Sequence, residues 1–542
     1  MRVRGNDYRV LRPPERYDPT LRVSVIVPAY GGQDKLDLVL AALARQTYSE
    51  ALTEVIVVDN GSTPPLRLPG ERPAGTRLIV CETPGRASAR NAGLAAATGD
   101  VIHWLDSDVV LTPGAVEAHM RWHHTAPYLV VTGYIRFTEA PVPAELPDDL
   151  ERAFEPAEPH AWIIDLVERT NGLTDNPQRP FSLHVGGATS VNARLVEAAG
   201  PMDDELILGQ DTEMGYRLSQ AGAVFVPEPA ARAYHLGPTM RMRDKQPIDR
   251  VSHAFVADRI PSYRWLRSNP GRQWKVPYVT VVLDGTAGYE TVRATVDALL
   301  AGTVPDISIV LVGPWDSAGR ERRAPLTDPG LDLLLVHGHY QYEGRVRFAS
   351  TGEADPAVPF VLRLPSGWVP GEDTLAKLLD LARDEGLGLV NVLLHESADG
   401  VRTARLERAS AFARARIVLR PEECLDDAVD DVSGVSWVET ESYPFTTEPP
   451  VVLGRRGALR ARTEAQDEAA RLAKEAAKEA ERLRGQVARW RDEAAKWRKS
   501  AVELRREVGS LRRQLAAAKR AQQGLRVVLS TTVKRALGKG RR

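Results

Sequence analysis

Two aspartates separated by one residue, Asp106 and Asp108, follow the short apolar run 101–105. Such a run is typical of a buried strand, which would deliver both carboxylates to the edge of a sheet. Two carboxylates in one place form a hard, oxygen-rich site of the kind that Mg²⁺ or Mn²⁺ prefers. A cation so placed would neutralise a diphosphate leaving group. The tripeptide alone is a weak signal, because nearby aspartates also occur in turns and at helix caps.

Other polar side chains follow the strand signals upstream. The apolar run 23–27 leads into Pro28 and Tyr30, and the run 55–58 ends at Asp59, with a helical pattern between the two. This alternation predicts an α/β fold, a mostly parallel sheet flanked by helices. Ligands of such sheets bind in the crevice beyond the carboxyl ends of the strands. We therefore expect these residues to converge with the two aspartates on one site.

Four segments resemble the family-2 glycosyltransferases, which are inverting enzymes of the GT-A fold. They are 23–30 (VSVIVPAY), 54–62 (EVIVVDNGS), 85–108 (GRASARNAGLAAATGDVIHWLDSD) and 186–222. Their order and spacing make the resemblance specific. It implies a GT-A-type sheet, a nucleotide-sugar donor, most often a UDP-sugar, and a carbohydrate or lipid-linked acceptor.

The resemblance also implies roles for individual residues. Pro28, Tyr30 and Asp59 would frame the nucleotide base, with Arg90 near the base or the phosphates. The donor-binding set is Pro28, Tyr30, Asp59, Arg90 and Asp106, and the metal set is Asp106, Asp108 and His235. Asp108 would be the main metal ligand, and His235 resembles a later histidine that completes the coordination in many members. Each residue also has an ordinary interpretation, as a turn residue, a surface charge or a structural histidine.

The catalytic base is expected within residues 208–213. Inversion requires a carboxylate that takes the proton of the acceptor hydroxyl on the side opposite the leaving group. The family usually has a Glu-Asp pair here, but this chain has Gln210, which leaves Asp211 as the matching base. Glu213 is the second candidate, although carboxylates in the first turn of a helix are also ordinary partners of its dipole.

Residues 273–450 resemble a degenerate second copy of the first domain. The stretch 23–47 aligns without a gap on 279–303, and 105–114 aligns on 364–371. Pro365 and Gly367 stand where the first copy has its two aspartates, so we expect the fold to be kept and the metal chemistry to be lost. Chance similarity is the alternative, because all βα units resemble one another.

Residues 460–530 predict a coiled coil. Apolar side chains alternate at spacings of three and four, which is the heptad pattern of helices that pair. The seam runs through Leu483, Val487, Trp490, Ala494, Trp497, Ala501, Leu504, Val508, Leu511, Leu515, Ala518, Gln522, Leu525 and Leu529. A lone helix would leave its tryptophans in water, so a homo-oligomer is expected. The basic tail 531–542 either binds anionic lipid or is a solvated terminus.

The composition of the chain limits the partners and the cellular compartment that we expect. The chain of 542 residues has a net charge of −1 and only two cysteines, Cys81 and Cys424. These values indicate no nucleic-acid partner and no disulfide framework. There is neither a signal-peptide pattern nor an apolar run long enough to cross a bilayer. We expect a cytoplasmic protein with possible peripheral contact at the inner membrane face.

The expected organisation is an N-terminal extension (1–22), a catalytic domain (23–272), a degenerate domain (273–450), the coiled coil (460–530) and the tail (531–542). The expected activity is metal-dependent transfer of a hexosyl or N-acetylhexosaminyl group in cell-envelope or exported glycan synthesis. A two-domain glycan polymerase and a non-catalytic nucleotide-sugar-binding scaffold are the alternatives. A dinucleotide-binding oxidoreductase is disfavoured, because no G-x-G-x-x-G follows the first strand.

Overall fold

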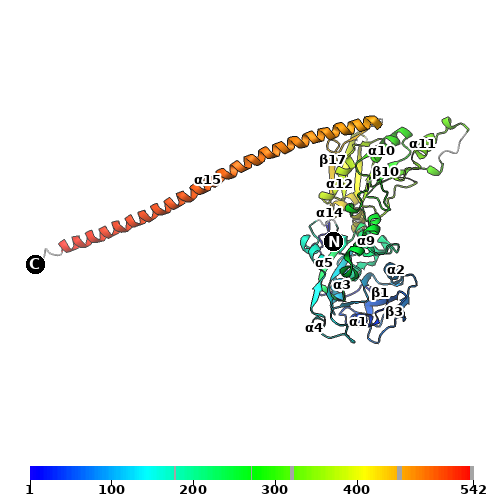
Figure 1. Ribbon diagram of the computed structural model, residues 1–542, viewed down its shortest axis with the longest axis horizontal. Coiled ribbons are helices and arrows are strands. Elements are labelled where there is room, and N and C mark those ends of the chain that lie inside the picture. Colours follow the sequence, from blue (N-terminus) through cyan, green and yellow to red (C-terminus); the bar gives the residue numbers. More distant parts are fainter. Residues whose placement is uncertain (176–178, 270, 318–322, 399, 449–454, 538–542) are drawn as a thin grey trace. The chain divides into compact units, whose positions relative to one another are not determined.

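The computed structural model describes residues 1–175, 179–269, 271–317, 323–398, 400–448 and 455–537, with the side chains of the last segment described at 463 and at 466–522. The chain divides into two compact units, residues 1–450 and 451–542. Within the described residues, the first unit holds two large sheets and a two-stranded one, and the second holds one long helix (Figure 1).

The first sheet has nine strands in the order β3-β2-β1-β4-β8-β6-β9-β5, with β7 added beside β6. Its first four strands are parallel, and β8 is antiparallel to both of its neighbours. The strands are β1 (Val23–Ala29), β2 (Thr53–Asp59), β3 (Thr76–Val80), β4 (Val101–Leu105), β5 (Val109–Leu111), β6 (Leu129–Thr138), β7 (Ala157–Pro159), β8 (Ala188–Asn192) and β9 (Val224–Leu236).

The central strands of this sheet are buried on both faces, which explains their continuous apolar sequences. Val25 of β1 packs into the cluster that contains helix α1, whereas its neighbour Ile26 packs into the cluster that contains α2. Helices α1 and α2 therefore cover opposite faces. The helices of this domain are α1 (Gln33–Ala44), α2 (Arg86–Ala96), α3 (Ala115–His123), α4 (Leu150–Phe154), α5 (Ala161–Arg169), α6 (Ala193–Ala199), α7 (Gln210–Gln220), α8 (Met240–Arg243) and α9 (Lys245–Arg259).

The second sheet follows the order β12-β11-β10-β13-β16-β15-β17. This order repeats β3-β2-β1-β4-β8-β6-β9 strand for strand, and each neighbouring pair has the same relative direction. The strands are β10 (Val279–Asp284), β11 (Ile307–Val312), β12 (Val346–Ala349), β13 (Phe360–Arg363), β15 (Leu389–Ser397), β16 (Gly400–Arg408) and β17 (Val435–Glu439), with a separate pair β14 (Val369–Pro370) and β18 (Phe445–Thr446).

The helices of the second sheet domain are α10 (Tyr289–Ala301), α11 (Leu331–Tyr340), α12 (Thr374–Asp384), α13 (Ala409–Val418) and α14 (Leu425–Val432). Short 3-10 turns are η1 (Tyr8–Val10), η2 (Glu50–Leu52), η3 (Pro180–Leu183), η4 (Arg264–Leu266), η5 (Trp315–Ser317) and η6 (Pro325–Thr327). The predicted fold class is confirmed: two α/β sheet domains followed by a long helix. A common origin of the two domains stays a prediction, which their shared strand order supports.

The two sheet domains are joined by buried polar contacts. Arg414 of α13 donates hydrogen bonds to the carbonyl oxygens of Gly222 and Ala223 at 2.8 Å each. Tyr216 of α7 donates one to the carbonyl of Ala357 at 2.5 Å. The segment 1–22 is also packed rather than free: the side chain of Asn6 bonds both the N–H and the C=O of Phe225.

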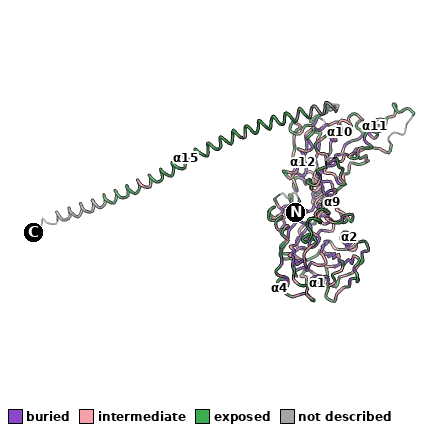
Figure 2. Tube along the Cα trace, in the orientation of Figure 1, coloured by how far each residue is buried: buried purple, intermediate pink, exposed green. Residues whose placement is uncertain are grey.

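The second unit is the single helix α15 (Arg455–Leu537). Within its described side chains, nearly all residues are exposed, including the seam tryptophans Trp490 (76%) and Trp497 (75%) (Figure 2). The predicted seam is thus an uncovered apolar stripe on a single chain. The predicted tail lies largely outside the described residues, because side chains are not described beyond 522. No helix in the described ranges is both long and apolar enough to cross a membrane.

Candidate active site at the carboxyl edge of the first sheet

The carboxyl ends of β1, β2 and β4 bring together most of the predicted site residues. Ala29 lies opposite Asp59 in the parallel ladder, and Ile26 of β1 lies opposite Trp104 of β4. Directly after β4, Asp106 and Asp108 form a turn in which the N–H of Val109 donates to the carbonyl of Asp106 at 3.1 Å. The turn ends in the short strand β5, so both aspartates lie at the sheet edge, as predicted.

Arg90 joins two of the predicted acidic residues. Its guanidinium, on α2, is 1% exposed and donates from Nη2 to Asp106 Oδ1 at 2.7 Å and from Nη1 to Asp211 Oδ1 at 2.5 Å. Nη2 also donates to the carbonyl of Gly186 at 3.1 Å. The planar guanidinium is suited to such two-sided pairing, because its donors lie in a fixed fork. Asp106 and Asp211, which are far apart in sequence, are therefore neighbours in the site.

Two glycines make room for this bridge. A Cβ on Gly186 would lie 2.2 Å from Arg90 Nη2, which is far inside contact distance. A Cβ on Gly187 would lie 3.2 Å from Asp106 Oδ2, which is a tight contact. The Gly186-Gly187 turn before β8 is therefore needed to seat the Arg90 guanidinium against the two carboxylates.

Burial and neighbouring charge act on Asp106 in opposite directions. Removal from water raises its pKa, Arg90 opposes this effect, and the negative charges of Asp211 and Asp108 raise it again. The net effect is a raised pKa for Asp106. Arg90 is therefore the strongest of the groups that favour the charged form of Asp106, since an opposite charge nearby stabilises an ionised carboxylate.

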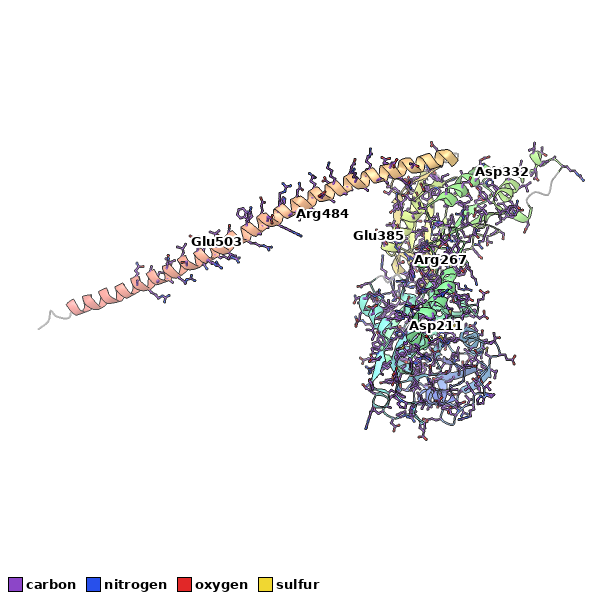
Figure 3. The ribbon with its side chains drawn as sticks, in the orientation of Figure 1. Asp211, Arg267, Asp332, Glu385, Arg484 and Glu503 are labelled. Carbon is purple, nitrogen blue, oxygen red and sulfur yellow. The ribbon has the colours of Figure 1, made fainter. Side chains whose placement is uncertain are left out.

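Asp211, labelled in Figure 3, is in the first turn of helix α7. It is partly open to solvent, with a side chain 33% exposed. The competing candidate, Glu213, is only 5% exposed and is held by Arg217, with 2.6 Å from Arg217 Nε to Glu213 Oε1 and 2.7 Å from Nη2 to Oε2. A base must reach the proton it removes. Of the two carboxylates, the geometry favours Asp211 for that role.

His184 lies directly behind Asp211. Its Nδ1 is 2.8 Å from the carbonyl oxygen of Asp211, so this nitrogen carries the hydrogen and donates it. Burial lowers the pKa of His184 to about 4, which keeps the ring neutral near pH 7. The side chain therefore fixes the backbone at the start of α7 without adding charge to the site.

Asp108 and His235 form a second group beside Asp106. Their closest atoms, Asp108 Oδ1 and His235 Nε2, are 3.6 Å apart. His235 Nδ1 is 2.8 Å from the carbonyl oxygen of Gly237, so Nδ1 bears a hydrogen and Nε2 is the nitrogen that faces the carboxylate. A carboxylate oxygen and an imidazole nitrogen facing each other in this way are suited to a divalent metal ion.

The metal set is only partly assembled by the protein. Asp106 directs one oxygen to Arg90 rather than toward His235. Among the residues that the structure describes, no group of three or more His, Cys, Asp or Glu side chains is arranged to hold a metal ion. The residues present thus fit a metal held by two protein side chains, with its other ligands supplied from elsewhere.

The predicted base-binding residues differ in their surroundings. Asp59 is buried, and its two oxygens accept from the backbone N–H groups of Ser62 (2.9 Å) and Leu66 (3.0 Å). Burial works against ionisation of Asp59, but these hydrogen bonds outweigh it and lower its pKa. Asp59 therefore shapes the loop 60–66. Tyr30 is 77% exposed, available to a ligand, and Pro28 lies in β1. Contact with a nucleotide base stays a prediction for all three.

Sequence reasoning missed Lys35 and His184. Lys35 of α1 donates to the carbonyl of Leu236 at 2.6 Å, and its Nζ lies 4.0 Å from Asp108 Oδ2. In the sequence it is one lysine in the first turn of a helix, so no local signal distinguished it. His184 precedes the Gly186-Gly187 turn, and that proximity was the available signal.

Comparisons with known proteins show similarity to glycosyltransferases. Residues 24–173 match the model "Glycosyl transferase family 2". An uncharacterized glycosyltransferase, YfnE, of Bacillus subtilis is 28% identical over 244 residues, covering 38% of this chain and 62% of the relative. The pre-mycofactocin glycosyltransferase of Mycobacterium tuberculosis is 27% identical over 230 residues, covering 41% and 44%. The chondroitin synthase of Escherichia coli is 23% identical over 356 residues, covering 60% and 50%.

The chain thus spans 62% or less of the length of each of these relatives. Among solved structures, the mannosyltransferase PcManGT of Pyrobaculum calidifontis, in complex with GDP-Man and Mn²⁺, is 17% identical with a TM-score of 0.31, covering 48% of this chain and 67% of that one. The family match thus covers residues 24–173, less than half of the chain, and for this region the similarity is to glycosyltransferase family 2.

Proposed function

We propose that the chain transfers a hexosyl or N-acetylhexosaminyl group from a nucleotide-sugar, a UDP-sugar in the first instance, to an acceptor hydroxyl with inversion. The observation that carries the proposal is the Arg90 bridge between Asp106 and Asp211. This bridge brings a partly exposed carboxylate next to the carboxyl end of β4, and ligands of parallel sheets bind in the crevice beyond such ends.

Asp211 takes the proton of the acceptor hydroxyl while the acceptor oxygen forms its bond to the anomeric carbon. The bond from that carbon to the diphosphate oxygen breaks, and its electron pair leaves with the nucleoside diphosphate. Arg90 holds the Asp211 carboxylate in place, because the guanidinium pairs with it directly. Pro28, Tyr30 and Asp59 frame the base of the donor.

Asp108 and His235 are the residues that would hold a Mn²⁺ or Mg²⁺ ion, with Asp106 at the edge of the set. When bound, the ion supplies positive charge for the leaving diphosphate. Lys35 lies on the other side of Asp108 and adds a second cation near the same place. The acceptor we propose is a carbohydrate or a lipid-linked glycan of the cell envelope.

One active centre per chain is part of the proposal. In the second sheet domain, Pro365 and Gly367 stand where β4 is followed by the two aspartates. The indole of Trp315 covers the corresponding sheet edge: a Cβ on Gly285 would lie 2.4 Å from its ring, and one on Gly313 would lie 3.2 Å from it. These features disfavour a two-site polymerase.

The test is a donor panel with Mn²⁺ or Mg²⁺ that measures binding and transfer separately. We expect Asp211→Asn to bind donor like the wild type but to lose transfer by about 10²- to 10⁴-fold, the usual contribution of a general base. Asp108→Ala should lose metal-dependent donor binding. The matched control is Asp204→Asn, an exposed aspartate seven positions before Asp211, which should change neither. Full transfer by Asp211→Asn would refute the assignment.

A further inference from the structure

A cavity of about 470 Å³ lies where the two sheet domains of residues 1–450 meet. Phe181 and Tyr216 line it from the first domain, and Tyr278 and Phe360 line it from the second. Its volume is within the range of small-molecule sites. None of the residues discussed as donor, metal or base groups lines it, so it is a separate place on the molecule.

The lining of this cavity has one sign of charge. Five of its residues are arginines, and no aspartate or glutamate is among the described residues that line it. Two of the five arginines have their charge balanced by carboxylates that do not line the cavity. Arg264 pairs with Asp306 at 2.6 Å, and Arg383 pairs with Asp380 and Asp384 at 2.8 and 2.9 Å.

The other three arginines have no carboxylate partner among the described residues. Arg414 donates to backbone carbonyls, those of Gly222 and Ala223 among them. Arg408 donates from Nε to the carbonyl of Leu387 at 2.7 Å and from Nη2 to that of Ala382. Arg179 is exposed, and its guanidinium lies over the rings of Tyr263 and Trp265. Carbonyl groups satisfy donors but bring no compensating charge, so the cavity keeps a net positive charge.

This arrangement is costly for the empty protein. Burial lowers the pKa of Arg408 and of Arg414 to about 10, because no nearby anion favours their charged forms. A buried charge without a counter-charge destabilises the folded chain. An anion in the cavity would supply that counter-charge through charge-assisted hydrogen bonds, for which guanidinium groups are well suited.

Aromatic rings alternate with the cations. The Arg179 guanidinium lies 4.6 Å from the ring centroid of Trp265, which is 54% exposed, and that of Arg408 lies 5.0 Å from the ring of Phe360. Phe360 in turn packs edge to face with Tyr278 at 5.5 Å. Phe360 is buried, whereas the exposed ring of Trp265 beside a cation offers an apolar platform for a ring-shaped ligand that also carries negative charge.

We propose that this cavity binds an anionic saccharide, that is, a sugar carrying phosphate or carboxylate groups. Its role as the acceptor, or an extension of the acceptor, rests on the proposed function; its binding does not. Helix α7 connects the two places, because Asp211 is in its first turn and Tyr216 and Gln220 of the same helix line the cavity. At 1.5 Å per residue, the nine steps from Asp211 to Gln220 span roughly 14 Å, a few sugar units.

The test uses the full chain with a chelator and without nucleotide-sugar, so that neither a metal ion nor a donor is bound at the proposed donor site. Calorimetry would compare glucose 6-phosphate and glucuronate with uncharged glucose in low-salt buffer. We expect at least one of the two anionic sugars to bind, glucose to bind at least tenfold more weakly, and added salt to weaken the anionic sugar. Comparing glucose 6-phosphate with glucuronate shows whether the cavity prefers a phosphate or a carboxylate group.

Substitutions locate the binding. Arg408→Met should weaken the anionic sugar on the order of tenfold, and Arg179→Ala several-fold, because each loses a charge-assisted contact. Arg179 is exposed, so its replacement keeps the test valid if Arg408→Met fails to fold. Arg194→Ala, an exposed arginine of α6 outside the cavity, is the control and should bind like the wild type. Equal affinity for glucose, or wild-type affinity in the Arg179 variant, would overturn the proposal. A chain that binds the anionic sugar but transfers nothing would refute only the proposed function.

Discussion

At the scale of single residues, Arg90 organises the first site. It is buried, it separates two carboxylates that would otherwise repel each other, and it is the only described side chain that contacts both Asp106 and Asp211. The bridge also gives a physical reason for the glycine pair at 186–187, because a side chain at either position would crowd Arg90 or Asp106. A residue of this kind contributes to stability and to site geometry at the same time.

Replacing Arg90 should therefore lower the free energy of unfolding. We expect Arg90→Met to cost about 3 kcal/mol, because removal of the buried guanidinium leaves two partly buried carboxylates close together without a counter-charge. Arg90→Lys should recover only part of this loss, since an ammonium cannot fork between two carboxylates. Urea denaturation is the measurement. Arg86→Met, on the exposed side of the same helix, is the control and should stay within about 0.5 kcal/mol. A fully stable Arg90→Met protein would contradict a bridging role.

A buried histidine cluster predicts acid sensitivity. The rings of His103 and His119 are 4.6 Å apart, and both His119 and His123 lie 2.8 Å from the Ser190 hydroxyl. Burial lowers the pKa of His103 from 6.5 to about 4 and that of His123 to about 3. Above pH 6.5 both the folded and the unfolded chain keep these rings neutral. Below it the unfolded chain binds protons that the folded chain refuses, so stability falls as pH falls toward 4.

The slope should be about 1.4 kcal/mol per pH unit for each such histidine. His103→Leu removes one titrating group. The change breaks no hydrogen bond, because both ring nitrogens of His103 lack a partner among the described residues. The variant should show a shallower loss of stability between pH 6.5 and 4 in urea titrations at several pH values. His253→Leu, at an exposed histidine of α9, should leave the slope of the wild type unchanged. Identical slopes for His103→Leu and the wild type would contradict the argument from burial.

At the scale of elements, the sequence predicted most of what the structure contains. The strands that end at Ala29, Asp59 and Leu105 were readable from their apolar runs, and the long helix from its heptads. The Arg90–Asp211 contact was not, because it joins positions 121 residues apart and depends on how α2 and α7 pack. Lys35 was missed for the same reason: its proximity to Asp108 arises from tertiary packing.

Helix α15 predicts a concentration-dependent assembly. Its seam side chains are exposed on a single chain, and burying them against a second helix would remove apolar surface from water. We expect the full chain to sediment as an oligomer and a chain ending at residue 450 to sediment as a monomer. The double change Leu504→Glu and Leu511→Glu should also give a monomer. Val502→Glu, an equally apolar position off the seam, is the matched control and should stay oligomeric; a monomeric wild type would refute the prediction.

At the scale of the whole molecule, the two sheet domains share a strand order but differ at the edge where ligands bind. Aspartates and an arginine occupy that edge in the first domain, and the ring of Trp315 covers it in the second. The duplicated fold was suggested by a gapless alignment of β1-α1 with β10-α10. The covering by Trp315 was not visible in the sequence, because that residue lies outside the aligned segments.

This difference predicts a single donor per chain. Titration of a nucleotide-sugar in the presence of Mn²⁺ should give a stoichiometry of one, with the heat abolished by Asp108→Ala. Ser366→Ala, a substitution at the position between Pro365 and Gly367, should leave the stoichiometry and the affinity for the nucleotide-sugar unchanged. Two donors per chain, or half of the binding left in Asp108→Ala, would instead indicate that the second sheet edge is active.

The N-terminal segment has a consequence for how the chain is made. Arg2 donates to Glu423 at 2.6 Å and to Asp431 at 2.5 Å, and the N–H of Gly5 donates to the carbonyl of Val432 at 2.8 Å. Residues 2–5 thus meet these partners only after some 430 further residues have been synthesised, roughly 20 to 90 s later at ordinary translation rates. During that interval residues 2–5 lack these contacts, so their docking must follow the synthesis of the second sheet domain.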